Sequence, residues 1–330
     1  MSDQTPTPEP QSELRSAIAA NTTKKRTILV TVLAVLVVAA VAVGGVVLGT
    51  SLGGQKAEAD GAPGTERLHL KLAVSEDSAY QDAIKQVAAE KGLDLEWVNV
   101  DDWVLPNTEL AAGNVDGNAF QHILYLSAFN AEQGADITPV FSTLIVQWGI
   151  FSATLGDVAD IPDGARIAIP DDPANGGRAL HILEAAGLIT LAADAGDFPT
   201  TSDISSNLRK LSFVEIAATT IPQQFDDPSL SAVVVGTSYF DPSQNVSKGD
   251  ALYLDDPTDD ANLPYVNVVA TTADRLDNPA WKILEQVYAD PRVATALEQE
   301  YFGNNIPVDV PVEKLRAKLA ELEKAAADTQ

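Results

Sequence analysis

The sequence predicts an α/β fold with two lobes, preceded by one N-terminal transmembrane helix. Predicted strands and helices alternate from residue 67 onward, and this β-α-β rhythm is typical of a parallel sheet. The chain has 330 residues, 45% of them hydrophobic, which is enough for a sizeable core in two lobes. Ile28–Leu48 is an uncharged run of 21 residues in which Thr31 is the only polar side chain. As a helix this run would be roughly 32 Å long, enough to cross a bilayer.

The N-terminal part is predicted to anchor the protein in the cell membrane as a single-pass segment. Residues 1–26 form a disordered cytoplasmic tail, 27–52 the transmembrane anchor and 53–66 a flexible linker. The basic residues Lys24–Arg26 precede the apolar run, which places the C-terminal bulk outside the cytoplasm. Ala57–Ala59 has the small-x-small form of a signal-peptide cleavage site, but the apolar run exceeds the core of about 7–15 residues usual in such peptides. We therefore favour an uncleaved anchor.

The remaining chain is predicted to form lobe 1 from residues 67–145 and 264–330, and lobe 2 from residues 146–263. Alternating or continuous apolar patterns predict strands at Leu68–Val74, Leu93–Val100, Ala165–Ile169, Leu211–Ile216, Ala232–Val235 and Tyr265–Thr271. The long apolar run Val140–Ser152 is interpreted as a strand that crosses between the lobes. Helical spacing predicts helices at Ala79–Lys91, Ala119–Ala131, Arg178–Ala186, Ile221–Phe225, Pro279–Ala289, Arg292–Tyr301 and Val312–Ala326. Leu315, Leu319 and Leu322 mark one side of the last helix as a core-facing or partner-facing seam.

The segment Ile169–Leu188 is the most informative for function. It is predicted as a strand, a loop rich in Pro, Asp, Asn and Gly, and a helix that opens at Arg178. Such a unit directs free backbone N–H groups and the helix dipole toward an anion. Arg178 adds a planar cation suited to a carboxylate, and Asn175 adds a second polar arm. The alternative is that Arg178 is an ordinary surface residue at a helix start.

Composition excludes several classes of function. The net charge of −26 repels phosphate backbones, so no nucleic-acid partner is expected. The absence of cysteine excludes disulfides, thiolate metal sites, cysteine nucleophiles and a lipid-modified cysteine. No catalytic or cofactor-binding motif is present, so we expect no enzyme, no catalytic residue and no cofactor.

Acidic residues in two loops are predicted to be solvated rather than to bind a metal. Asp171 and Asp172 lie between prolines with no base nearby. The second run could bind a divalent ion, but it lacks the glycine and the terminal glutamate of a calcium loop. This run consists of Asp255, Asp256, Asp259 and Asp260.

Five segments together resemble the methionine-binding proteins of bacterial ABC importers, the MetQ/NlpA type. The resemblance spans about residues 67–307 and rests on DDWVLPN (Asp101–Asn107), GNVDGNAFQHILYL (Gly113–Leu126), IPDDPANGGRALHILEAAGLITL (Ile169–Leu191), FVEI (Phe213–Ile216) and YVNVVAT (Tyr265–Thr271). It implies a two-lobed periplasmic-binding-protein fold, type II-like, that closes around one amino acid. The implied partners are the permease and ATPase of the importer.

The resemblance also implies the ligand-binding residues. An aromatic box falls on Trp103, Phe120, His122 and Tyr125, with Trp103 where the family usually has Tyr. Arg178 would bind the ligand carboxylate with help from Asn175, and Asn267 would meet the backbone-like end of the ligand from the other lobe. Thr237 lies in the loop where the family commonly places an Asn. Without the resemblance, Phe120 and Tyr125 would be interpreted as core residues and His122 as a structural histidine.

Together these observations predict an extracytoplasmic protein that binds methionine or a closely related amino acid and delivers it to an ABC permease. One alternative is a membrane-tethered sensor or interaction protein of the same fold without a role in transport. It is motivated by the acidic surface, the short tail and the altered loop Gly236–Ser238. A second alternative is that the ligand is another amino acid or a short peptide.

Overall fold

The computed structural model describes residues 67–100, 102–257 and 260–328, which belong to one compact unit, Thr65–Gln330. The predicted tail, anchor and linker lie outside the described residues. Among the helices that the structure describes, none combines the length and the apolar character needed to cross a membrane.

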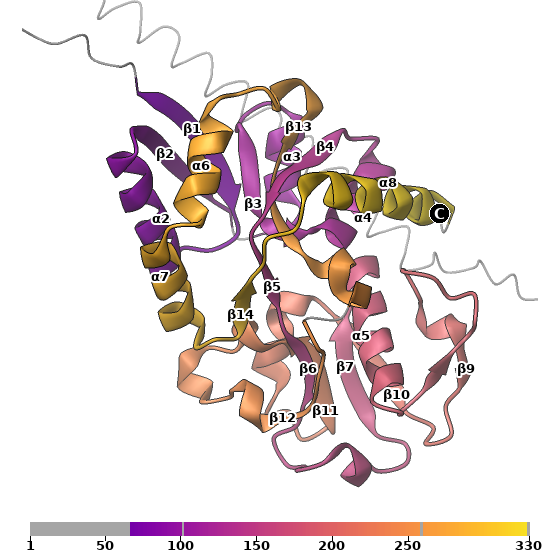
Figure 1. Ribbon diagram of the computed structural model, residues 1–330. Helices are drawn as coiled ribbons and strands as arrows, with labels where there is room; N and C mark the ends of the chain where they lie inside the picture. The colour runs from indigo at the N-terminus through magenta and orange to yellow at the C-terminus, as the bar shows by residue number, and fades with distance from the viewer. Residues whose placement is uncertain (1–66, 101, 258–259, 329–330) are drawn as a thin grey trace, which may run out of the picture. The chain divides into compact units, whose positions relative to one another are not determined.

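Two five-stranded sheets organise the described chain (Figure 1). The first has the strand order β2-β1-β3-β13-β4, from β1 (Leu68–Val74), β2 (Leu93–Asn99), β3 (Gly117–His122), β4 (Ile137–Ser142) and β13 (Asn267–Thr272). The second has the order β10-β7-β11-β6-β12, from β6 (Trp148–Phe151), β7 (Arg166–Pro170), β10 (Ser212–Ile216), β11 (Ala232–Gly236) and β12 (Ala251–Leu254). Two short pairs complete the strands: β5 (Leu144–Val146) with β14 (Asn305–Pro307), and β8 (Thr190–Leu191) with β9 (Ile204–Ser206).

The pairing confirms the predicted α/β architecture. Strand β1 is parallel to β2 and β3, and β7 is parallel to β10 and β11. The predicted strand Tyr265–Thr271 is β13, which lies antiparallel between β3 and β4 of the first sheet. The long run Val140–Ser152 is not one strand but parts of three, because β4 belongs to the first sheet, β5 pairs with β14, and β6 belongs to the second sheet. The predicted limits of the two lobes stay a prediction.

Helices pack around both sheets. They are α2 (Ala79–Glu90), α3 (Leu105–Ala111), α4 (Ile123–Gln133), α5 (Pro173–Ala185), α6 (Ala280–Tyr288), α7 (Pro291–Tyr301) and α8 (Val312–Asp328). The predicted helices Ile221–Phe225 and Arg292–Tyr301 are found as the 3₁₀ segment η3 (Ala218–Gln224) and as α7. Part of the predicted loop Asp101–Asn107 is helical, because α3 begins at Leu105 after Asp102 has accepted bonds from the N–H groups of Val104 and Leu105.

Two helix starts were wrong in the prediction. The segment from Gly117 to His122 is strand β3, and α4 begins only where His122 Nδ1 accepts the N–H of Tyr125 at 3.1 Å. Helix α5 begins at Pro173 rather than Arg178, because Asp172 caps it by accepting the N–H of Asn175 at 2.9 Å.

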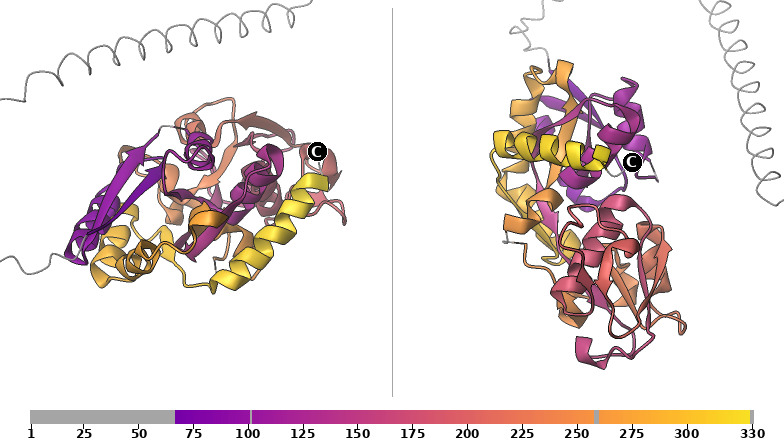
Figure 2. Two further views of the ribbon diagram at one scale, coloured as in Figure 1. Left: turned by 90° about the horizontal axis from the view of Figure 1, so that it is seen from above. Right: turned by 90° about the vertical axis from the view of Figure 1, so that its right-hand side faces the viewer.

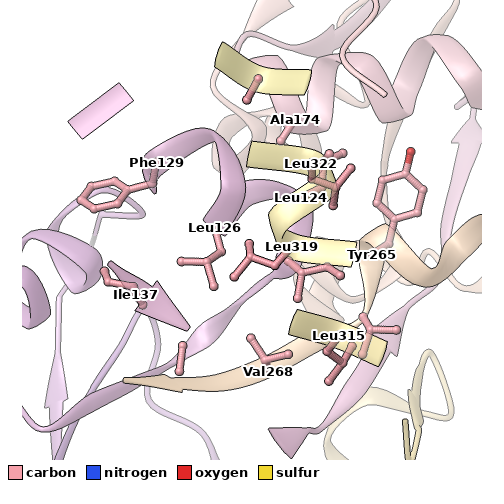
Figure 3. Packing of buried hydrophobic residues seen from close by; sticks show 14 of the residues in the cluster. Leu124, Leu126, Phe129, Ile137, Ala174, Tyr265, Val268, Leu315, Leu319 and Leu322 are labelled. Carbon is pink, nitrogen blue, oxygen red and sulfur yellow. The ribbon is translucent and has the colours of Figure 1, made fainter. Parts of the chain in front are cut away.

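The leucine seam of the last helix faces a core. Leu315, Leu319 and Leu322 are at most 4% exposed, and α8 lies against α4 (Figures 1 and 2). Figure 3 shows these leucines close to Leu124, with Ala174 in the same cluster. Ala174 comes from α5, the helix that packs on β7 of the second sheet, so this cluster connects the two sheets.

Candidate functional site

A cavity of about 290 Å³ lies where segments from both sheets meet. Three predicted site residues line it, namely Trp103, Phe120 and Asn267. Trp103 lies in the segment before α3, Phe120 on β3 and Asn267 at the start of β13. The second sheet contributes Tyr239 from the 3₁₀ turn η4 (Thr237–Tyr239), which follows β11.

The four residues of the predicted aromatic box come together around Tyr125. Its ring meets Trp103, Phe120 and His122 edge to face, with ring centroids 6.1 to 6.3 Å apart. Trp103 also contacts Tyr239 at a centroid distance of 5.5 Å, and this contact bridges the two sides of the cavity. Tyr125 and His122 do not line the cavity and instead support the rings that do.

Behind these rings, polar groups form a hydrogen-bonded chain. Asn175 Nδ2 donates to the Asp172 carboxylate at 3.1 Å, and Asn175 Oδ1 lies 3.0 Å from His122 Nε2. Since His122 Nδ1 accepts the N–H of Tyr125, the network assigns the proton to Nε2, which donates to Asn175. Burial and the nearby charge of Arg178 lower the pKa of His122 to about 3, although the bond to Asn175 raises it. His122 is therefore neutral at physiological pH.

Asp172 corrects one expectation. It was predicted to be a solvated loop acid, but it is half-buried and caps α5. Desolvation raises its pKa, while its bonds from Asn175 lower it. Asp171, next to it, is exposed as predicted.

Arg178 is not the surface residue of the alternative interpretation. Its side chain is 1% exposed and lies in the second turn of α5. Nη2 donates to Asp255 Oδ2 at 2.6 Å and to the carbonyl of Val146 at 2.9 Å. The guanidinium lies 4.1 Å from the ring centroid of Tyr265 and 5.0 Å from that of Trp148. The Nε atom is buried without a hydrogen-bond partner.

Asp255 was predicted to belong to a solvated acidic run, but its side chain is only 10% exposed and pairs with Arg178. The pair joins residues 77 positions apart, so no local pattern could show it. Of the other acids in the run, Asp256 is exposed and Asp259 lies outside the described residues. Within the described part of the chain, no group of His, Asp and Glu side chains could hold a metal ion.

We call Arg178, Asp255, His122, Asn175 and Asp172 the buried polar cluster.

The cluster does not line the cavity, but it lies directly behind one wall. Val146 lines the cavity, and its carbonyl accepts the bond from Arg178. Thr237 is also set back, because it is 2% exposed and its hydroxyl donates to the carbonyl of Gln147 at 3.0 Å. The next residue, Ser238, lines the cavity in its place.

Three acceptor residues of the cavity were missed by sequence reasoning: Glu76, Gln81 and Asn305. Glu76 lies at the exposed rim, and its Oε1 accepts the hydroxyl of Tyr301 at 2.6 Å. Surrounding protein atoms raise the pKa of Glu76 by desolvation. Gln81 and Asn305 are 8% and 6% exposed, and Gln81 Oε1 and Asn305 Oδ1 have no hydrogen-bond partner. Each of these three residues lies in a segment without a recognisable motif, so the sequence does not identify it as a cavity residue.

Comparison with known proteins identifies relatives over most of the chain. Residues 70–309 match the family model described as NlpA lipoprotein. Lipoprotein 28 of Escherichia coli K12 is 35% identical over 243 residues, covering 72% of this chain and 88% of the relative. The D-methionine-binding lipoprotein MetQ of the same organism is 32% identical over 241 residues, with the same coverage. A nutrient-binding protein of Burkholderia cenocepacia, solved bound to methionine, superimposes with a TM-score of 0.67 at 32% identity, covering 72% of this chain and 99% of that chain.

Proposed function

The chain belongs to the NlpA lipoprotein family, and from this premise we propose that it binds methionine or a closely related amino acid outside the cytoplasm. It delivers this ligand to the permease and ATPase of an ABC importer. The protein acts by binding and release, so it is not an enzyme and needs no cofactor.

The observation that carries this proposal is the aromatic wall of a small cavity. Trp103, Phe120 and Tyr239 line a space of about 290 Å³, at the lower limit of ligand pockets and suited to one amino acid. A methionine thioether gains from burial against rings and from sulfur–aromatic contacts. Asn267, on the same cavity, offers an amide to the polar end of the ligand.

Arg178 is proposed as the partner of the ligand carboxylate. Its Nε is the one buried side-chain nitrogen without an acceptor among the described residues, so the guanidinium still has a hydrogen bond to give. Val146 separates Arg178 from the cavity, because Val146 lines the cavity and its carbonyl accepts a bond from Arg178. Asn175 and Thr237 then support the site by holding neighbouring protein groups in place, because both are buried and already hydrogen-bonded to protein groups.

Calorimetry tests the proposal on the full chain in mild detergent. We expect L-methionine to bind with micromolar or tighter affinity, and a titration with D-methionine to show which enantiomer is preferred. No heat with methionine at tens of micromolar, together with heat for another solute, would exclude methionine as the ligand.

The anchor is a separate proposal, supported by the apolar run Ile28–Leu48 and by the absence of a cysteine that could carry lipid. We expect the protein in the membrane fraction after a high-salt wash, with its N-terminus intact. A mature N-terminus near Asp60 would show instead that the run is a cleaved signal peptide.

A further inference from the structure

We propose that Glu76, Gln81 and Asn305 form an ammonium-binding end of the cavity, which selects ligands with a free amino group. This inference rests on the proposed function and adds the group that recognises the positive end of the ligand.

The three residues reach one cavity from three separate elements. Glu76 follows β1, Gln81 lies on α2, and Asn305 lies on β14, whose register places it opposite Val146 of β5. Figure 1 shows α2, α7 and β14 next to one another on this side of the fold. Tyr301, at the end of α7, holds Glu76 in place through the 2.6 Å bond to Oε1, which leaves Oε2 for another donor.

The charge at the cavity has one sign. Among the described residues that line it, Glu76 alone has a carboxylate or a basic group. The nearby cation Arg178 stands behind the wall, and Asp255 neutralises it. An ammonium group is therefore attracted to the Glu76 end of the cavity.

The buried amide oxygens point to the same chemistry. A buried acceptor without a donor is costly, and native proteins leave few of them. Gln81 Oε1 and Asn305 Oδ1 are both in this state, on residues at least nine-tenths buried that line the cavity. An ammonium group carries three N–H donors and no acceptor, so it complements a carboxylate and two amide oxygens.

The test compares two variants and three probes by calorimetry on the full chain in detergent. Glu76→Gln removes the charge while keeping the shape. Glu300→Gln is the matched control, because it removes a carboxylate close enough to raise the pKa of Glu76 but does not line the cavity. The probes are L-methionine, its analogue without the carboxylate, and its analogue without the amino group.

We expect Glu76→Gln to weaken L-methionine binding by about tenfold or more, the loss typical of a hydrogen bond to a charged group. Glu300→Gln should stay within about twofold of wild type. The analogue without the amino group should bind wild type and Glu76→Gln equally. Asn305→Ala should weaken L-methionine binding in the same direction as Glu76→Gln.

The outcomes separate the two proposals. Wild-type affinity of Glu76→Gln for L-methionine would overturn the ammonium site while leaving methionine binding intact. If methionine does not bind but the analogue without the carboxylate does, and binds Glu76→Gln more weakly, the proposed ligand is wrong and the ammonium site stands. The ammonium assignment is overturned if neither L-methionine nor its analogue without the carboxylate binds the wild-type protein. It is also overturned if calcium or sodium alone binds the wild-type protein and this binding is absent in Glu76→Gln.

Discussion

The buried polar cluster and the cavity lie on two sides of one wall, and they treat their polar groups in opposite ways. In the cluster, Arg178 is paired with Asp255, and His122 and Asn175 are bonded to each other. At the cavity, the amide oxygens of Gln81 and Asn305 have no partner. The positive charge of Arg178 is thus paired with Asp255 of the scaffold, whereas two of the three buried side-chain atoms without a partner among the described residues lie at the cavity. Arg178 Nε, the one unpaired atom of the cluster, is the exception.

Arg178→Ala has the largest expected effect. It leaves the Asp255 carboxylate buried without its partner, so we expect the free energy of unfolding to fall by about 3–5 kcal/mol. Chemical denaturation measures this loss. Arg292→Ala is the control, because the Arg292 side chain is about half exposed, so water screens its ion pairs with Glu90 and Asp290 and they should contribute little to stability. A loss below 1 kcal/mol for Arg178→Ala would mean that the pair does not hold the scaffold.

Trp103→Ala tests the cavity side of the comparison. The ring lines the cavity and contacts Tyr239, so we expect ligand affinity to fall by about 2–3 kcal/mol, or roughly 30- to 150-fold. Calorimetry with L-methionine measures the change. Leu208→Ala, at a residue 89% exposed and away from the cavity, should leave affinity unchanged. Equal affinity in Trp103→Ala and wild type would remove the aromatic wall from the site.

His122 predicts a pH dependence that belongs to the cluster. Its folded-state pKa of about 3 lies below the ordinary value of 6.5, so the unfolded chain takes up the proton first as the pH falls. The contribution of neutral His122 to the free energy of unfolding is fully present above pH 6.5. Between pH 6.5 and the folded-state pKa it declines by about 1.4 kcal/mol per pH unit as the pH falls. Comparing pH 7 with pH 5, His122→Asn should therefore lose about 2 kcal/mol less than wild type. Identical pH profiles for the two proteins would contradict a buried neutral histidine.

Thr237→Val should give the smallest effect. The change removes one hydroxyl bond to the carbonyl of Gln147, so we expect a stability loss of about 1 kcal/mol. Because Thr237 does not line the cavity, ligand affinity should stay within about twofold of wild type. Ser238→Ala is the companion variant, since Ser238 does line it. A large affinity loss in Thr237→Val but not in Ser238→Ala would mean that Thr237 contacts the ligand.

Sequence patterns predicted what local periodicity determines. The alternation in Leu68–Val74 corresponds to strand β1, and the leucine spacing in Val312–Ala326 corresponds to the buried side of helix α8. The helix start at Ile123 was missed because Ala119, Phe120, Ile123 and Leu124 also fit the spacing of one helix face, so the helix was predicted to begin at Ala119. Only a histidine that accepts a backbone N–H marks the boundary, and histidine is not a usual N-cap.

The site divides along the same line. Trp103, Phe120 and Asn267, which line the cavity, could be predicted from the family motifs because they lie within short recognisable segments. The pairing of Arg178 with Asp255 depends on two segments that meet only in the folded chain. Gln81 and Asn305 matter because they lack a partner, and a missing hydrogen bond leaves no trace in a sequence.

The hydrophobic cluster that joins the two sheets has a consequence for their separation. Ala174 and Phe198 are buried with Leu315 and Leu322 of α8, so separating the sheets exposes apolar surface to water whether or not a ligand is present. The cluster therefore favours the arrangement of the two sheets seen in the structure, and a partner that separated the sheets would have to expose this apolar surface to water.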